Sequence, residues 1–148
     1  IEIDLPVTTV YNQWTQFEEF PRFMEGVEEV RQLDDTHLHW VADIDGFKRE
    51  WDAEITEQIP DERVAWKNID GATNAGVVTF HRLAEAETRV TVQMEHETEG
   101  MMESLGSALG ADSRRVQGDL ERFKDLVEGR GVESGAWRGE VEQGRQVR

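Results

Sequence analysis

No cysteine occurs among the 148 residues of this chain. Disulfide bonds, thiolate nucleophiles and cysteine-ligated metal sites are therefore excluded. The chain also lacks a run of about 18 apolar residues, the length that a membrane-spanning helix requires. No basic segment followed by an apolar stretch opens it, so no export signal is predicted. We therefore expect no membrane span and a cytoplasmic location.

Basic residues are scarce, since 16 Lys and Arg stand against 32 Asp and Glu, for a formal net charge of −16. Nucleic acids and anionic membranes repel such a surface, so neither is expected as a partner. The acidity is typical of a strongly solvated surface, and a specific cationic partner is the alternative. Phosphate-binding glycine loops, a GxSxG elbow and a metal-spaced Cys/His set are also absent. No metal, nucleotide or other cofactor is predicted.

Hydrophobic periodicity predicts a strand, two short helices, a series of strands and a long helix. The first strand (1–5) stops at Pro6, and helical spacing covers 8–17 and 18–26. Further strands are predicted at 27–34, 37–45, 47–59, 63–68, 76–83 and 88–97. After Gly100, three- and four-residue steps predict one long amphipathic helix, whole or in two pieces. Residues 129–148 are predicted to be a loose, glycine-rich acidic tail beyond a domain of residues 1–128.

This order of elements predicts an α+β fold with one curved antiparallel sheet. A sheet with one apolar face must have that face covered, and only the last helix is long enough to cover it. A twisted sheet that wraps around a single helix leaves a large space between the two. The sequence therefore predicts an internal cavity.

The same stretches resemble a known superfamily. They are VYNQWTQFEEFPRFMEGVEEV, REWDAEITEQIPDERVAWKN, GATNAGVVTFHRL, RRVQGDLERFKDLVEGRG and ESGAWRGEV. Together they resemble the START-like, helix-grip superfamily (SRPBCC), and within it the polyketide cyclase/dehydrase and lipid-transport family, which includes coenzyme Q-binding proteins. The ending GAWRGEV is similar to a subgroup of uncharacterised bacterial cyclase-like proteins. The resemblance implies a deep apolar cavity for a hydrophobic or polycyclic ligand, without metal or nucleotide.

One arginine stands out in the predicted sheet. In FKREWDAEI, the two-residue period places Arg49 on the inner face with Phe47 and Trp51. A buried arginine must be paired, because an isolated buried charge costs several kcal/mol. Its partner is either an oxygen of a ligand, such as an enolate in a cyclisation, or an internal carboxylate such as Glu95 or Glu97, unless a bulge turns the side chain outward. Arg49 is thus a candidate catalytic residue with both interpretations open.

Histidines supply the other candidate for chemistry. His96 shares a face with Val90, Val92 and Met94 and is the second predicted catalytic residue, as a general acid or base; a satisfied core histidine is the alternative. His37 and His39 share the opposite, solvated face of their strand. We interpret them as a surface pair rather than as metal ligands.

Large apolar side chains are the candidate ligand-binding residues. Three tryptophans on the inner faces of neighbouring strands either fill the core or form a stacking wall for a flat ring system. With the other predicted lining residues, the set is Trp40, Trp51, Trp66, Phe80, Met94, Phe47, Met101 and Leu105.

Three functional hypotheses follow. The first is binding of a hydrophobic small molecule of the polyketide, quinone or lipid type, which needs only an apolar lining and one polar group. The second is a polyketide cyclase, aromatase or dehydratase, which needs several convergent polar groups. The third is a protein-interaction module in which Trp137 of the tail docks on a partner; a homodimer is also open.

Overall fold

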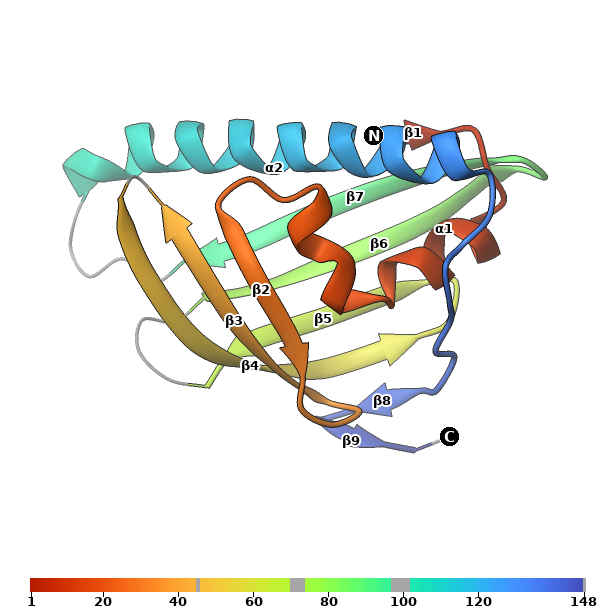
Figure 1. Ribbon diagram of the computed structural model, residues 1–148, viewed down its shortest axis with the longest axis horizontal. Helices are drawn as coiled ribbons and strands as arrows, with labels where there is room; N and C mark the ends of the chain where they lie inside the picture. Colours follow the sequence, from red (N-terminus) through yellow and green to blue (C-terminus); the bar gives the residue numbers. More distant parts are fainter. Residues whose placement is uncertain (45, 70–73, 97–101, 148) are drawn as a thin grey trace.

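The computed structural model describes residues 1–44, 46–69, 74–96 and 102–147 (Figure 1). Within these ranges, the side chains of residues 44, 74, 95, 96 and 102–113 are outside the description. The elements are β1 (Glu2–Ile3), α1 (Val7–Trp14), the 3-10 helix η1 (Phe17–Arg22), β2 (Val27–Gln32), β3 (His37–Ile44), β4 (Phe47–Ile59), β5 (Arg63–Asn68), β6 (Asn74–Ala84), β7 (Glu87–His96), α2 (Met102–Arg130), β8 (Val141–Glu142) and β9 (Arg145–Gln146).

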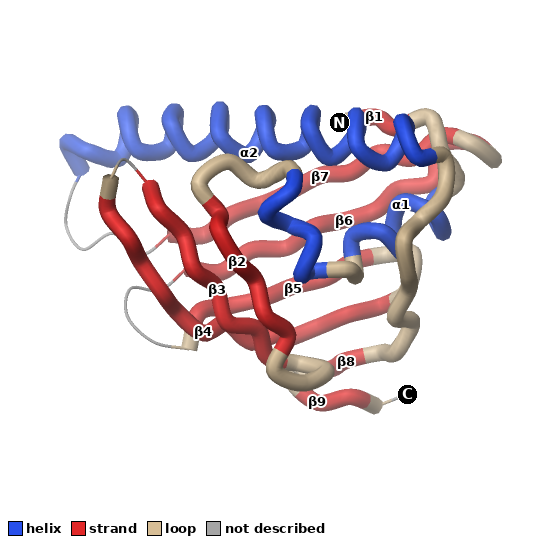
Figure 2. Tube along the Cα trace, in the orientation of Figure 1, coloured by secondary structure: helices blue, strands red, loops and turns tan. Residues whose placement is uncertain are grey.

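The strands form one curved sheet in the order β1-β7-β6-β5-β4-β3-β2, with antiparallel neighbours throughout. The sheet curves around the side on which η1 and α1 lie, and α2 runs along the length of the molecule (Figures 1 and 2). The helix-grip fold predicted from the sequence is therefore confirmed.

The long helix α2 is continuous from Met102 to Arg130, although its sequence contains four glycines. Each glycine weakens a helix by about 1 kcal/mol relative to alanine. Packing offsets this cost, because the side chains of Leu120, Phe123 and Val127 are buried against the sheet and the short helices. Full burial of one such side chain contributes about 1.5–3 kcal/mol. Tertiary contacts therefore decide that α2 is one helix.

The segment after α2 packs on the rest of the protein, which corrects the expectation of a loose tail. The backbone N–H of Ser134 donates to Oε1 of Gln13 at 2.8 Å, and that of Trp137 to the hydroxyl of Thr15 at 3.1 Å. Beyond them, β8 adds to β4, and the Val141 side chain is completely buried.

The expectation of an acidic tail is corrected too. Residues 129–148 carry Glu133, Glu140 and Glu142 against Arg130, Arg138, Arg145 and Arg148. The segment is thus slightly basic, and two of its arginines, Arg130 and Arg138, form ion pairs with carboxylates of the body. Its lack of hydrophobic periodicity reflects an extended chain that lies on a surface, for which no period is required.

Candidate ligand-binding site

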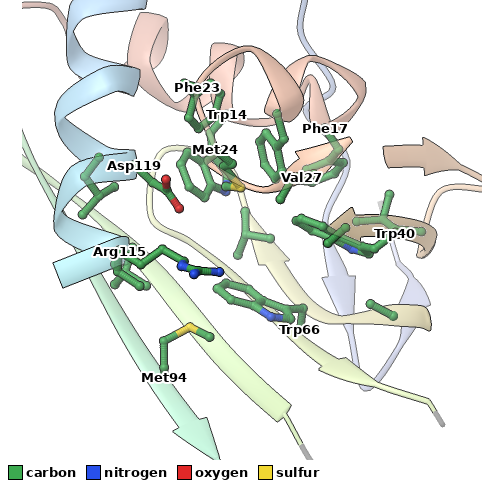
Figure 3. A pocket seen from close by; sticks show the side chains of 18 of the residues that line it. Trp14, Phe17, Phe23, Met24, Val27, Trp40, Trp66, Met94, Arg115 and Asp119 are labelled. Atoms are coloured by element: carbon green, nitrogen blue, oxygen red, sulfur yellow. The ribbon is translucent and has the colours of Figure 1, made fainter. Parts of the chain in front are cut away.

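A cavity of about 260 Å³ lies between the concave face of the sheet, η1 and α2. Apolar and aromatic side chains dominate its lining (Figure 3). The lining residues are Trp14, Phe17, Phe20, Phe23, Met24, Glu25, Val27, Leu38, Trp40, Ala42, Trp51, Ala53, Ile55, Val64, Trp66, Asn68, Val92, Met94, Arg115, Val116, Asp119 and Leu120. The volume lies near the lower end of the range of about 300–1,000 Å³ that is usual for small-molecule sites.

Two stacked tryptophans form part of the sheet wall. Trp40 of β3 and Trp51 of β4 are directly paired across the strands, and their rings stack with centroids 5.8 Å apart and planes 8° apart. The indole N–H of Trp40 is buried and has no acceptor among the described residues. A buried donor without a partner is costly, at about 1–3 kcal/mol. The wall therefore holds one buried hydrogen-bond donor without a partner among the described residues.

A third tryptophan, Trp66 of β5, lies over a glycine of the neighbouring strand. Gly76 of β6 is paired with Trp66 on one side and with Met94 of β7 on the other. A Cβ atom at position 76 would lie 2.6 Å from Cζ2 of Trp66 and 3.0 Å from the backbone oxygen of Gln93. Only glycine therefore leaves space for the indole ring in this position, which makes Gly76 part of the site although it does not line the cavity.

The opposite wall consists of aromatic rings from α1 and η1. Trp14 meets Phe20 with ring centroids 5.0 Å apart, and Phe17 meets Phe20 edge-to-face at 5.4 Å. Sequence reasoning treated these side chains as ordinary helix positions and missed them as lining. A signal was present, because Phe17, Phe20 and Phe23 recur every third residue. This spacing places side chains on one face of a 3-10 helix.

Polar groups gather at the α2 side of the cavity. Arg115 and Asp119 lie one helical turn apart and both extend toward the cavity, Arg115 in the direction of Trp66 (Figure 3). Burial raises the pKa of the Asp119 carboxyl above its ordinary value, against hydrogen bonds from the backbone N–H of Glu25 and from Arg122 that lower it. A carboxyl with a raised pKa next to a guanidinium is an arrangement that can bind a polar group of a ligand or exchange a proton with it.

Asp119 and Arg122 also fix the segment that follows η1. Oδ1 of Asp119 accepts the backbone N–H of Glu25 at 3.0 Å, and Nε of Arg122 donates to the backbone oxygen of Phe23 at 2.7 Å. The guanidinium of Arg122 in turn donates to Oδ1 of Asp119. Residues 23–25, which contribute three lining side chains, are thereby tied to α2.

Four of the predicted ligand-binding residues, Trp40, Trp51, Trp66 and Met94, line the cavity. Met101 lies outside the described residues, and so do the side chains of Leu105 and His96.

Three other expectations are corrected. The Arg49 side chain is exposed and Phe47 is 68% exposed, because burial along β4 begins only at Trp51. The two-residue period gave the face correctly, since Arg49 is paired with the lining residue Ala42. The period does not show how far along β4 the concave face is covered by other elements. Phe80 is buried behind the cavity instead of lining it, where its ring meets those of Tyr11 and Trp14.

The paired histidines lie on the outer face, as expected. His39 contacts Asp52 at 2.7 Å and Glu50 at 3.1 Å through its two ring nitrogens, and His37 contacts Asp34 at 2.8 Å. The hydrogen bonds that the His39 ring donates to the carboxylates of Asp52 and Glu50 raise the pKa of His39. No group of three or more His, Cys, Asp or Glu side chains suited to a metal ion occurs in the described part of the chain. No helix of that part is long and apolar enough to cross a membrane.

A family model described as polyketide cyclase/dehydrase and lipid transport matches residues 3–125. The chain therefore belongs to this family. It is also 56% identical, over 142 residues that cover 95% of both chains, to an uncharacterised 17.2 kDa protein from Streptomyces lincolnensis.

Solved structures share the fold. A protein from Deinococcus radiodurans is 25% identical with a TM-score of 0.67, and the match covers 87% of this chain and 95% of that one. An aromatase/cyclase from a Streptomyces species is 12% identical with a TM-score of 0.75, covering 93% and 95%. A START superfamily protein from Mycobacterium smegmatis is 12% identical with a TM-score of 0.70, covering 87% and 94%. At 12% identity these last two likenesses concern the fold alone.

Proposed function

We propose that this protein binds a compact hydrophobic, ring-containing small molecule of the polyketide, quinone or lipid type in the cavity between sheet and α2. The observation that carries the proposal is the lining, in which aromatic and aliphatic side chains surround a small number of polar groups. Such a lining is typical of ligand sites. Family membership and the shared fold with an aromatase/cyclase support the same assignment.

Intrinsic fluorescence offers a direct test, because four of the five tryptophans line the cavity. We expect saturable quenching by one member of a panel that contains an aromatic polyketide, a quinone, a fatty acid and a sterol-like ring. A matched pair of variants on β7 separates cavity binding from adsorption. Val92→Phe adds a ring inside the cavity and should weaken quenching strongly, whereas Thr91→Phe adds the same ring to the exposed face and should leave it intact. A flat response to the whole panel, or equal quenching in both variants, would refute the proposal.

A cyclase, aromatase or dehydratase acting on a bound polyketone chain is the second candidate. Its support is the carboxyl of Asp119, whose pKa burial raises, at the cavity wall beside Arg115. A carboxyl whose pKa is raised is better suited to act as a general acid than one with an ordinary pKa. The test is turnover of the compound class that quenches fluorescence, compared between the wild type and Asp119→Asn. Turnover that is equal in the two proteins would exclude Asp119 from the chemistry.

The interaction hypothesis loses its main argument. Trp137 packs against the core of its own chain, so its ring is not presented to a partner.

A further inference from the structure

Arg115 is a cation inside an apolar cavity. Its guanidinium extends from α2 among the lining side chains (Figure 3). No carboxylate lies within 4.0 Å of it among the residues that the structure describes, although other arginines of α2, such as Arg122 and Arg130, each form such a pair. In a chain with twice as many acidic as basic residues, a cavity cation without a carboxylate partner calls for a physical reason.

Asp119 interacts with Arg115 through its charge but forms no direct ion pair with it, whereas it does form one with Arg122. Its Oδ1 already accepts hydrogen bonds from the backbone of Glu25 and from the guanidinium of Arg122. Asp119 is thus already paired with Arg122, and among the described residues Arg115 has no carboxylate in direct contact on the cavity side of the helix.

The second unpartnered group in the lining is also a donor. The buried indole N–H of Trp40 has no acceptor among the described residues. A guanidinium offers five N–H donors and no acceptor. An occupant that pairs with Arg115 must therefore carry an acceptor oxygen. A negative oxygen is favoured, because hydrogen bonds between charged groups are about twice as strong as neutral ones.

We propose that the ligand carries an acidic oxygen (a carboxylate, phenolate or enolate) on its ring system, and that Arg115 binds this oxygen. The proposal rests on the proposed function, since it specifies the class of ligand that the same cavity takes. It assigns a specificity-determining role to Arg115 and predicts that a neutral hydrocarbon of the same shape binds more weakly than the acid.

The test compares 2-naphthoate, a carboxylate at neutral pH, with its methyl ester, by fluorescence titration and calorimetry. We expect the wild type to bind the acid about ten- to a hundredfold more tightly than the ester. Arg115→Met keeps an unbranched apolar side chain without the charge and should abolish this preference. Arg114→Met removes the same charge from the neighbouring exposed position and should keep the preference.

The outcomes separate the two proposals. Equal binding of acid and ester by the wild type would overturn the role of Arg115 but leave cavity binding standing, and so would an unchanged preference in Arg115→Met. Failure of both compounds and of the broader panel would remove the proposed function and this inference with it.

Salt provides a further check, because the net charge of −16 repels anions. Screening by added salt should leave naphthoate affinity unchanged or raise it, whereas a loss of affinity would indicate binding to surface cations.

Discussion

The contact between Gly76 and Trp66 yields the most specific prediction. In Gly76→Ala, the new Cβ would lie 2.6 Å from Cζ2 of the indole, whereas ordinary van der Waals contacts begin at 3.4 Å. The ring must therefore move by about 0.8 Å, a distance that follows from these two values. The backbone oxygen of Gln93 at 3.0 Å closes off the space beside it. The cavity is the space left for this movement, since Trp66 lines it.

The energetic cost is worked out from two opposing effects. Overpacking of a core costs about 1–3 kcal/mol, and replacing a strand glycine by alanine returns about 0.5–1 kcal/mol. We expect the free energy of unfolding to fall by about 1–2 kcal/mol in urea titrations. Ligand affinity should fall about tenfold, which corresponds to about 1.4 kcal/mol, because the displaced ring narrows the site.

Gly129→Ala is the matched control, because a Cβ at this position of α2 meets nothing within 4 Å. That variant should gain up to about 1 kcal/mol of stability and bind ligand like the wild type. If Gly76→Ala had wild-type stability and wild-type affinity, the claim that this glycine sets the position of the Trp66 ring would be wrong.

Three further predictions concern the rest of the fold. Burial raises the pKa of Glu19, but the hydrogen bonds that its carboxylate accepts outweigh this effect and hold the pKa below the ordinary value of 4.5. The ionised carboxylate therefore stabilises the fold fully above pH 4.5, and this stabilisation is lost as the pH falls through the lowered pKa. Glu19→Gln should accordingly flatten the acid limb of a profile of stability against pH. Burial raises the pKa of Tyr11, the single tyrosine, to about 12, so ultraviolet absorbance should show no phenolate at pH 10. Tyr11→Phe should lower the free energy of unfolding by about 1–3 kcal/mol, because the amide of Gln58 loses its acceptor. Val141→Ala should cost about 2 kcal/mol in thermal or urea unfolding, whereas Val132→Ala, at 63% exposed, should cost nothing measurable.

The sheet and its inner face could be predicted from the sequence because a period of two is a local property. Alternation alone placed Trp40, Trp51, Trp66 and Met94 on the concave side, and all four line the cavity. The same period could not tell that Arg49 is exposed, because the extent of the covering elements depends on contacts distant in the sequence.

The packed C-terminal segment could not be predicted for a related reason. Its hydrogen bonds go to Gln13 of α1 and to Thr15 at the end of that helix, more than 120 positions earlier. An extended chain that docks in this way needs neither a two-residue nor a 3.6-residue period. Val141 is completely buried where β8 pairs with the distant strand β4, opposite Gln58, and hydrophobic periodicity does not distinguish that valine from the exposed Val132.

The polar end of the cavity, in contrast, had a signal in the sequence. Arg115 and Asp119 precede Phe123 by two helical turns and one, on the stripe that includes this completely buried ring. Positions four apart lie on the same face of a helix, so a charged pair in line with a buried phenylalanine is as anomalous as an arginine on an apolar strand face. The two positions differ in the structure, because Arg115 lines the cavity and is partly buried, whereas the Arg49 side chain is exposed. Arg115, therefore, rather than Arg49, is the arginine for which a ligand is the expected partner.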